Sequence, residues 1–184
     1  MKSNQLKIMK KLLFAFAVAM IIMGGCKNIK TKSELEEFQA QIAIEEQNID
    51  VVYKWLQEVN KENFEQMLNE LWAADAKQYF NSSSESVDLE AFVQMIDHLY
   101  QQYPIIKHEV HDMIAEDDKV IARFSAHVTH DVESFGVPAT GRELEWSAIA
   151  IFQLSDGKIV TRWEVTDVLD MYEQLGMELQ IKED

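Results

Sequence analysis

The hydrophobic positions follow two different periods along this chain, and the change comes at Pro104. Before Pro104, apolar residues recur every three or four positions, which is the spacing of one face of an amphipathic helix. Ser33 with Glu36 forms a capping box that marks the first start, and Asp88 caps a later helix. Helices are therefore expected at residues 33–59, with a break near 48–50, at 60–72 and at 88–103, and a short strand is expected around 78–80.

After Pro104 apolar and polar residues alternate, which is typical of strands that bury one face. Strands are expected at residues 105–116, 119–130, 142–154 and 158–167. Helices followed by an antiparallel run of strands are the element order of an α+β domain. The pair Asp156-Gly157 can take the positive φ angles of a tight hairpin, so the last two strands are expected to be neighbours in the sheet.

The last strand places Trp163, Val165 and Asp167 on one face, because successive side chains point to opposite sides. Asp167 then has two interpretations. Its carboxylate lies at the solvated end of the strand, where it caps the helix that follows, or it lies in a pocket. Burial in a pocket would raise its pKa toward values that suit proton transfer. From the residues alone, the solvated cap is favoured.

The strand expected at 119–130 carries an apolar row at its even-numbered positions, which includes Phe124 and continues to His130. This row is expected to face the helices, and His130 would then lie near the rim of a pocket. The alternative is a surface histidine at the end of a strand. On the next strand Trp146 and Phe152 share a face and could form the floor of a flat hydrophobic cavity. Core packing is the plainer explanation of both aromatic residues.

Several short motifs occur in a characteristic order. They are Gly136-Val137-Pro138-Ala139-Thr140-Gly141-Arg142, then Asp156-Gly157-Lys158-Ile159-Val160, then Trp163 with Asp167 four positions later, then Gln174-Leu175-Gly176. Residues 116–123 fit the same pattern upstream. Together they resemble the SnoaL-like polyketide cyclase (ester cyclase) family over roughly residues 52–176. The resemblance implies the cone-shaped α+β fold of the nuclear transport factor 2-like superfamily, in which helices close a curved antiparallel sheet over a pocket.

The resemblance also implies a chemistry. In the cyclases of this family, an aspartate at the position of Asp167 is the general acid/base, and no metal or cofactor takes part. His130 matches a family Thr-His pair, and Trp163 would line the pocket beside Asp167. The catalytic partner histidine of the cyclases falls at Gln153 in this chain. Because glutamine can donate a hydrogen bond but cannot carry a proton, this substitution argues against cyclase activity.

The N-terminal segment has the composition of a secretory signal. Lys10-Lys11 precede an apolar run at residues 12–23, which is too short to span a membrane, and Gly24-Gly25 precede the single cysteine, Cys26. The segment resembles a bacterial lipoprotein signal, in which the cysteine is lipidated and becomes the mature N-terminus. The chain is therefore divided into a signal peptide at 1–25, a tether at 26–32, a lead-in helix at 33–50 and a SnoaL-like domain at 51–184.

The charge of the chain narrows the choice of partners. The formal net charge is −15, and all 32 acidic residues follow Gly25. Such a charge disfavours direct binding to nucleic acid and to anionic membrane surfaces. Lipid on Cys26, rather than the protein surface, is therefore expected to hold the protein at the membrane of the bacterial cell envelope. Since no cysteine follows Cys26, the exported domain depends on its hydrophobic core rather than on a disulfide.

Other common chemistries lack support in the sequence. The five histidines have no spacing typical of a metal site, and no Gly-x-Ser-x-Gly motif accompanies a serine nucleophile. Two function classes stay open: a cofactor-free cyclase or isomerase that uses Asp167, and a non-catalytic module that binds a small hydrophobic molecule or a protein. The family further implies a homodimer formed through the outer face of the sheet, where Arg123, His127 and Ile149 are expected.

Overall fold

The computed structural model describes residues 32–178, 180 and 181. The chain divides into two compact units, residues 1–40 and residues 41–184. The predicted signal peptide, the predicted lipidation site Cys26 and the predicted tether up to residue 31 lie outside the described residues. Within the described part of the chain, no helix is both long enough and apolar enough to cross a membrane.

Of the first unit, the structure describes only the beginning of helix α2. This helix runs without interruption through Lys32–Glu58, so the break predicted near residues 48–50 does not occur. Asn48 is buried in the middle of the helix, and its side-chain amide donates to the carbonyl oxygen of Asp117 at 3.2 Å. A tertiary partner for its polar side chain keeps this residue within the helix, although asparagine favours helix ends in isolation.

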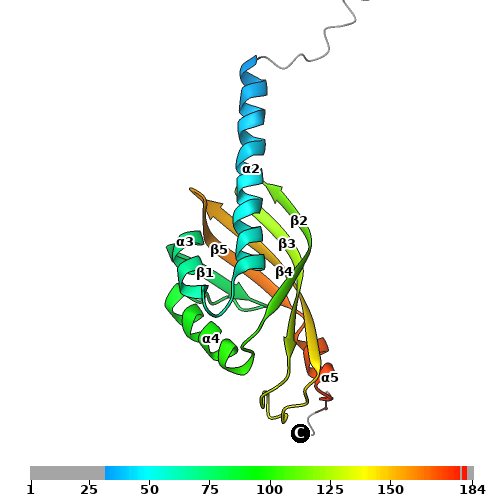
Figure 1. The fold of residues 1–184 in the computed structure, drawn as a ribbon. Helices are drawn as coiled ribbons and strands as arrows, with labels where there is room; N and C mark the ends of the chain where they lie inside the picture. Colours follow the sequence, from blue (N-terminus) through cyan, green and yellow to red (C-terminus); the bar gives the residue numbers. More distant parts are fainter. Residues whose placement is uncertain (1–31, 179, 182–184) are drawn as a thin grey trace, which may run out of the picture. The chain divides into compact units, whose positions relative to one another are not determined.

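The second unit is an α+β domain, as expected. After α2 its elements are α3 (Phe64–Leu71), β1 (Trp72–Phe80), α4 (Leu89–Gln102), β2 (Lys107–Glu116), β3 (Lys119–Thr129), β4 (Glu143–Ser155), β5 (Lys158–Thr166) and α5 (Val168–Gln174). Figure 1 shows this order along the ribbon. Strand β1 is longer than the sequence predicts and begins directly after α3. The segment that starts at Trp72 has helix-forming alanines, but the Trp72 ring is buried against Trp55 at a centroid distance of 5.1 Å.

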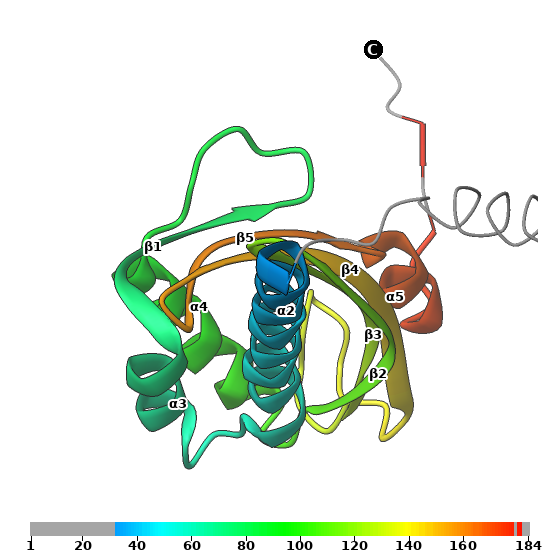
Figure 2. The same cartoon turned by 90° about the horizontal axis from the view of Figure 1, so that it is seen from above.

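The five strands form one sheet in the order β1-β5-β4-β3-β2. β1 pairs with β5 in parallel and every other pair is antiparallel, so the sheet is mixed rather than antiparallel throughout as the resemblance implied. The predicted hairpin between β4 and β5 is confirmed, because Asp156 and Gly157 have φ angles of 50° and 73°. Figure 2 shows the sheet curving around α3, α4 and the C-terminal half of α2, which lie on its inner face. The short helix α5 packs beside β4.

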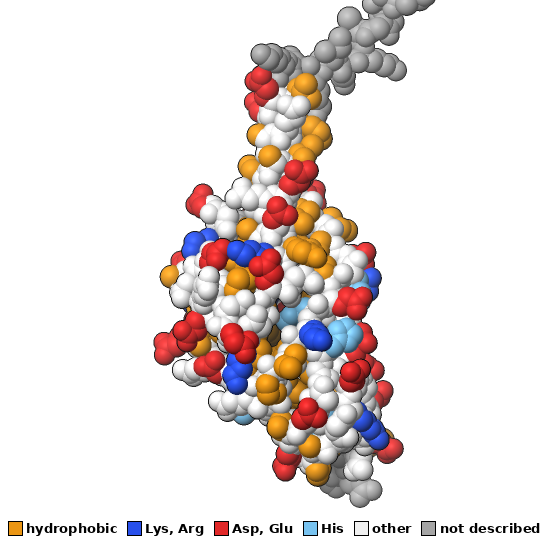
Figure 3. All heavy atoms as spheres, viewed as in Figure 1, with side chains coloured by type: hydrophobic (Ala, Val, Ile, Leu, Met, Phe, Trp, Pro, Cys, Tyr) orange, Lys and Arg blue, Asp and Glu red, His pale blue; other side chains and the backbone are white. Residues whose placement is uncertain are grey.

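The main core lies between these helices and the inner face of the sheet. It combines aromatic residues of the helices, such as Trp55, Phe64 and Phe92, with aliphatic residues of β3 and β4. The even-numbered residues of β3 are buried from Val120 to Val128, so this row faces the helices as predicted. At the surface, Asp and Glu side chains are spread over the face in Figure 3 rather than gathered in one patch.

Candidate functional site

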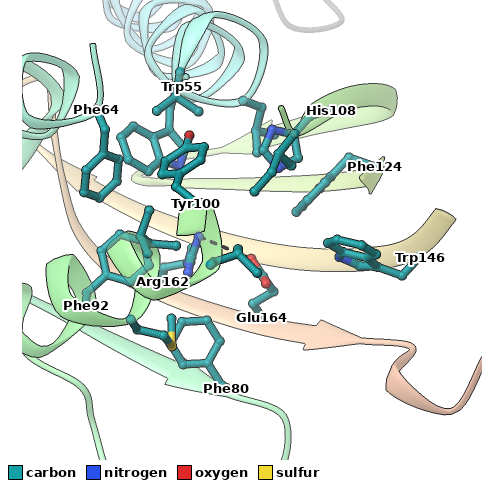
Figure 4. A pocket seen from close by; sticks show the side chains of 16 residues that line it. Trp55, Phe64, Phe80, Phe92, Tyr100, His108, Phe124, Trp146, Arg162 and Glu164 are labelled. Carbon is teal, nitrogen blue, oxygen red and sulfur yellow. Dashed lines mark ion pairs between the residues drawn. The ribbon is translucent and has the colours of Figure 1, made fainter. Parts of the chain in front are cut away.

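A small cavity lies within the second unit, between the helices and the inner face of the sheet. Its volume is about 140 Å³, and most of its walls are aromatic or aliphatic. Three elements supply the polar side chains that line it: α4 carries Tyr100, β2 carries His108, and β5 carries Arg162 and Glu164. Figure 4 shows these side chains among the rings that surround them. Polar groups in an apolar enclosure are the usual composition of a ligand site.

The strand register explains why β5 presents charged residues to this cavity. Phe124 of the buried β3 row pairs with Ala148, and Ala150 on the same face of β4 pairs with Glu164. The even-numbered residues of β5 therefore point inward at this end of the strand. Nearer the start of β5, the pairing with β4 is irregular between Gln153 and Leu154. This irregularity changes which residues of β5 point inward, so that Ile159 is buried as well as Arg162.

Arg162 and Glu164 form an ion pair inside the cavity wall. Nη1 of Arg162 lies 3.3 Å from Oε2 of Glu164, and their side chains are only 8% and 14% exposed. The guanidinium group stacks near three rings, at 5.7 Å from Trp72, 5.0 Å from Phe80 and 4.9 Å from Phe92. Burial lowers the pKa of Arg162, and the neighbouring Glu164 carboxylate opposes this shift. The hydroxyl of Thr166 also donates to Oε1 of Glu164 at 3.2 Å.

His108 and Tyr100 are the uncharged polar groups of the site. Burial lowers the pKa of His108, while the Glu164 carboxylate opposes the shift, so the imidazole is neutral at pH 7. Its ring meets Phe124 edge to face, with centroids 5.7 Å apart. Burial raises the pKa of Tyr100 to about 12, so its phenol stays protonated. The cavity thus contains one ion pair, one neutral imidazole and one phenol.

Comparison with known proteins identifies the domain. Residues 50–175 match the model of the SnoaL-like polyketide cyclase family. This chain belongs to the SnoaL-like polyketide cyclase family. IdmH, a proposed polyketide cyclase from Streptomyces antibioticus, is 28% identical with a TM-score of 0.64, and the match covers 71% of this chain and 99% of IdmH. No curated protein matches the chain significantly.

Two further solved structures show the same fold at lower identity. AclR, a proposed hydroxylase from Streptomyces galilaeus, is 24% identical with a TM-score of 0.61 over 74% of this chain and 97% of AclR. A proposed SnoaL-like polyketide cyclase from Jannaschia is 20% identical with a TM-score of 0.62 over 74% of this chain and 96% of its own. The fold expected from the sequence motifs is therefore confirmed: helices followed by a curved five-stranded sheet.

Asp167, the candidate catalytic residue of this SnoaL-like domain, lies outside the cavity. It is exposed and caps α5, where its Oδ1 accepts a hydrogen bond from the backbone N–H of Asp170 at 3.1 Å. Its own backbone N–H donates to the carbonyl oxygen of Ser147. Asp167 itself, together with Arg123, Ile149 and Val165, lines an open depression on the outer face of the sheet. The structure therefore shows the helix cap, the first of the two interpretations.

Trp163 does not line the cavity either, which corrects the sequence-based expectation. It points to the outer face of the sheet, is 38% exposed, and stacks on Tyr79 with ring centroids 5.8 Å apart. The shared face of Trp163, Val165 and Asp167 was predicted correctly, but that face is the outer one. Register places it there, because Trp163 pairs with the outward-facing Ile151 of β4.

The other predicted site residues divide between the cavity and its surroundings. Phe124 and Trp146 line the cavity. Phe152 is fully buried in the core without being among the lining residues. Gln153 lies away from the cavity and donates to Oδ2 of Asp118 at 2.6 Å. His130 is fully buried but does not line the cavity. It lies in the connection between β3 and β4, where its Nδ1 is 3.0 Å from the hydroxyl of Thr140.

Sequence reasoning missed the polar residues that do face the cavity: Tyr100, His108, Arg162 and Glu164. Their signal was available in part: the even-numbered row of β3 was expected to face the helices, and the observed register of β4 with both neighbours places Arg162 and Glu164 on that same face. The described residues contain no group of three His, Cys, Asp or Glu side chains placed to hold a metal ion.

Proposed function

We propose that this SnoaL-like domain binds a small, largely hydrophobic molecule in the cavity around Arg162 and Glu164. The observation that carries the proposal is a buried ion pair in a wall that is otherwise apolar and aromatic. Burying two charges costs free energy that a hydrophobic pair would not cost. Binding of a polar group of a ligand is a physical reason for the chain to keep these two charges at the cavity.

The mouth of the cavity offers a direct test of binding. Met95 lines the cavity and is 41% exposed, so a tryptophan can be placed there at little cost to the fold. A fragment library is screened by ligand-observed NMR against the purified protein. Met95→Trp is expected to weaken the binding of each hit at least about tenfold, which corresponds to roughly 1.4 kcal/mol.

Met177→Trp is the matched control, because Met177 is 36% exposed and is absent from the cavity lining. It is expected to leave the affinities unchanged. If both variants weaken the hits equally, or if neither does, the fragments do not bind in this cavity and the proposal fails.

A second candidate function is proton transfer, and the structure favours a different residue for it than the sequence did. Glu164 is the one carboxylate among the described residues that line the cavity. A general base must lie within hydrogen-bond reach of the proton it takes, which Glu164 can satisfy for a bound molecule and Asp167 cannot. Its pairing with Arg162 and Thr166 favours a fixed hydrogen-bonding role, and for that reason binding is placed first.

Deuterium exchange separates the two functions. A methyl ketone that binds in the cavity is incubated with the protein in heavy water, and NMR follows the loss of its methyl protons. Exchange that depends on Glu164 and disappears in Glu164→Gln would show catalysis of proton transfer. Exchange no faster than in buffer would leave a binding module without this activity.

We also propose that Cys26 anchors the protein by lipid in the bacterial cell envelope. The support is the leader at residues 12–26 together with the strongly acidic charge of the chain, which disfavours direct adsorption to anionic lipid. Metabolic labelling with a fatty-acid analogue is expected to label the wild type and not Cys26→Ser. Absence of label on both proteins would contradict the proposal.

A homodimer through the outer face of the sheet is the last part of the proposal. Two branched aliphatic side chains stand exposed there, Ile149 at 51% and Val165 at 62%. Light scattering of the purified protein is expected to give twice the monomer mass at high concentration, and Val165→Asp should shift it toward the monomer. A monomeric mass at every concentration would exclude this dimer.

A further inference from the structure

The size of the cavity limits what it can hold. A cavity of about 150 Å³ lined by aliphatic and aromatic side chains binds benzene. The present cavity, at about 140 Å³, is therefore matched to a molecule built on a single six-membered ring. A fused multi-ring molecule would require α4 or its side chains to move away from the sheet.

Two polar atoms in the cavity wall are left without hydrogen-bond partners among the described residues. They are Nε of Arg162 and Nδ1 of His108, and both atoms are buried. The two residues come from β5 and β2, so their side chains approach the cavity from different walls (Figure 4). A buried donor such as the Arg162 N–H costs about 1–3 kcal/mol when unmet. A bound molecule with an acceptor oxygen would remove this cost.

The charge of the site selects between acceptors. Glu164 already neutralises Arg162 at 3.3 Å, and His108 is neutral because burial disfavours its protonated form. The cavity therefore has no net positive charge left to balance an anion. A carboxylate next to Arg162 would also lie next to the Glu164 carboxylate, and like charges at short range repel strongly where water is excluded.

We infer that the ligand of this cavity is a neutral molecule of single-ring size that carries a carbonyl oxygen, and that Arg162 donates to this oxygen. The inference rests on the proposed function, since it names the class of molecule that the same site binds. The apolar rings of the wall cover the ring of the ligand, and the Arg162–Glu164 pair excludes carboxylic acids of the same size.

Three probes with the same number of non-hydrogen atoms test the inference: acetophenone, isopropylbenzene and benzoate. Isothermal titration calorimetry at neutral pH measures their affinity for the purified protein. Acetophenone is expected to bind at least about tenfold more tightly than isopropylbenzene, which lacks the acceptor, and benzoate is expected to bind more weakly than both. An acetylnaphthalene, with the same ketone on two rings, is expected to bind more weakly than acetophenone.

Substitution of the ion pair provides a second arm. Glu164→Gln leaves the charge of Arg162 unbalanced, so benzoate is expected to bind this variant at least about tenfold more tightly than the wild type. Glu143→Gln, on an exposed carboxylate of β4, is the charge-matched control and should leave benzoate binding unchanged. If Glu164→Gln does not fold, the ranking of the probes on the wild type still decides.

The outcomes separate this inference from the proposed function. If acetophenone and isopropylbenzene bind equally, or if benzoate binds the wild type most tightly, the cavity is a ligand site but the inferred ligand class is wrong. If an acetylnaphthalene binds best, the size limit is wrong. If none of the probes binds and Met95→Trp weakens the binding of no fragment, the proposed function itself fails.

Discussion

The two faces of strand β5 are buried in the opposite way to what their residue types suggest. On the inner face, Arg162 is buried beneath the helices and the side chain of Glu164 is only 14% exposed. On the outer face, Trp163 and Val165 are exposed, and Val165 is more than half accessible. Neighbouring residues of one strand therefore reverse the usual rule that apolar side chains are buried and charged ones are exposed.

The comparison shows that alternation along a strand fixes which residues share a face but not which face is buried. Pairing decides this: Glu164 lies opposite Ala150, which belongs to the buried row of β4. The charged residues are tolerated on the inner face because they neutralise each other and stack on aromatic rings.

The largest effect is expected from breaking the buried pair. Glu164→Ala leaves the Arg162 cation buried without a counter-charge, so the free energy of unfolding should fall by roughly 3–5 kcal/mol. Replacing both residues with apolar ones, Arg162→Met with Glu164→Leu, should restore stability to about the wild-type level. Urea denaturation midpoints measure both. Glu143→Ala, on an exposed carboxylate, is the control and should change stability by no more than about 0.5 kcal/mol. If Glu164→Ala and Glu143→Ala lose the same stability, the burial of the pair is refuted.

His108 should make stability depend on pH. Its folded pKa lies below the ordinary 6.5, because burial disfavours the protonated ring. The unfolded chain therefore binds more protons below that value, and stability should decline as the pH falls from about 6.5 toward the lower, folded pKa. The slope is at most about 1.4 kcal/mol per pH unit for one proton. His108→Gln should flatten the profile, and a profile that this substitution leaves unchanged would contradict the prediction.

Asp167 should behave as a helix cap and nothing more. Asp167→Ala removes the acceptor for the Asp170 N–H, so stability should fall by about 0.5–2 kcal/mol, while Asp167→Asn keeps an acceptor and should stay close to the wild type. Asp88→Ala provides the reference, since the Asp88 side chain caps α4 by accepting from the Ala91 N–H, also three residues later. Ligand binding should be unaffected by Asp167→Ala. A folded Asp167→Ala protein without binding or turnover would return Asp167 to the site.

The smallest effect is expected on the outer face. Val165→Thr replaces one exposed strand-forming residue with another, so stability should change by no more than about 0.5 kcal/mol. Val120→Thr makes the same change at a fully buried position of β3, where the new hydroxyl lacks water and should cost roughly 1–3 kcal/mol. Equal costs at the two positions would mean that the faces of the sheet are assigned wrongly.

Much of the fold follows from the sequence because it rests on local signals. The change of period at Pro104 separates helices from strands, and Asp156-Gly157 fixes the last hairpin. The start of β1 at Trp72 does not follow, since Trp72 joins the sheet through contacts with residues distant in sequence. The continuity of α2 at Asn48 likewise depends on a partner that is distant in sequence, Asp117.

The site was harder to predict than the fold because it violates the hydrophobic pattern that reveals the fold. The row that contains Trp163 is the more apolar face of β5, so the pattern alone assigns it to the interior. The row that contains Glu164 is buried only because of its pairing with β4 and its partner Arg162. Departures of this kind are expected where residues serve a site rather than the core. Phe124 and Trp146 were predictable, since core packing and cavity lining require the same residue type.

The most direct test of the account is to locate a bound ligand with methionine methyl groups labelled for NMR. Met95 lines the cavity, whereas Met177 follows α5 and is absent from the lining. On titration with acetophenone, the Met95 methyl resonance is expected to shift in a saturable way while the Met177 resonance stays in place. A saturable shift at Met177 with none at Met95 would place binding outside the cavity and contradict the central claim.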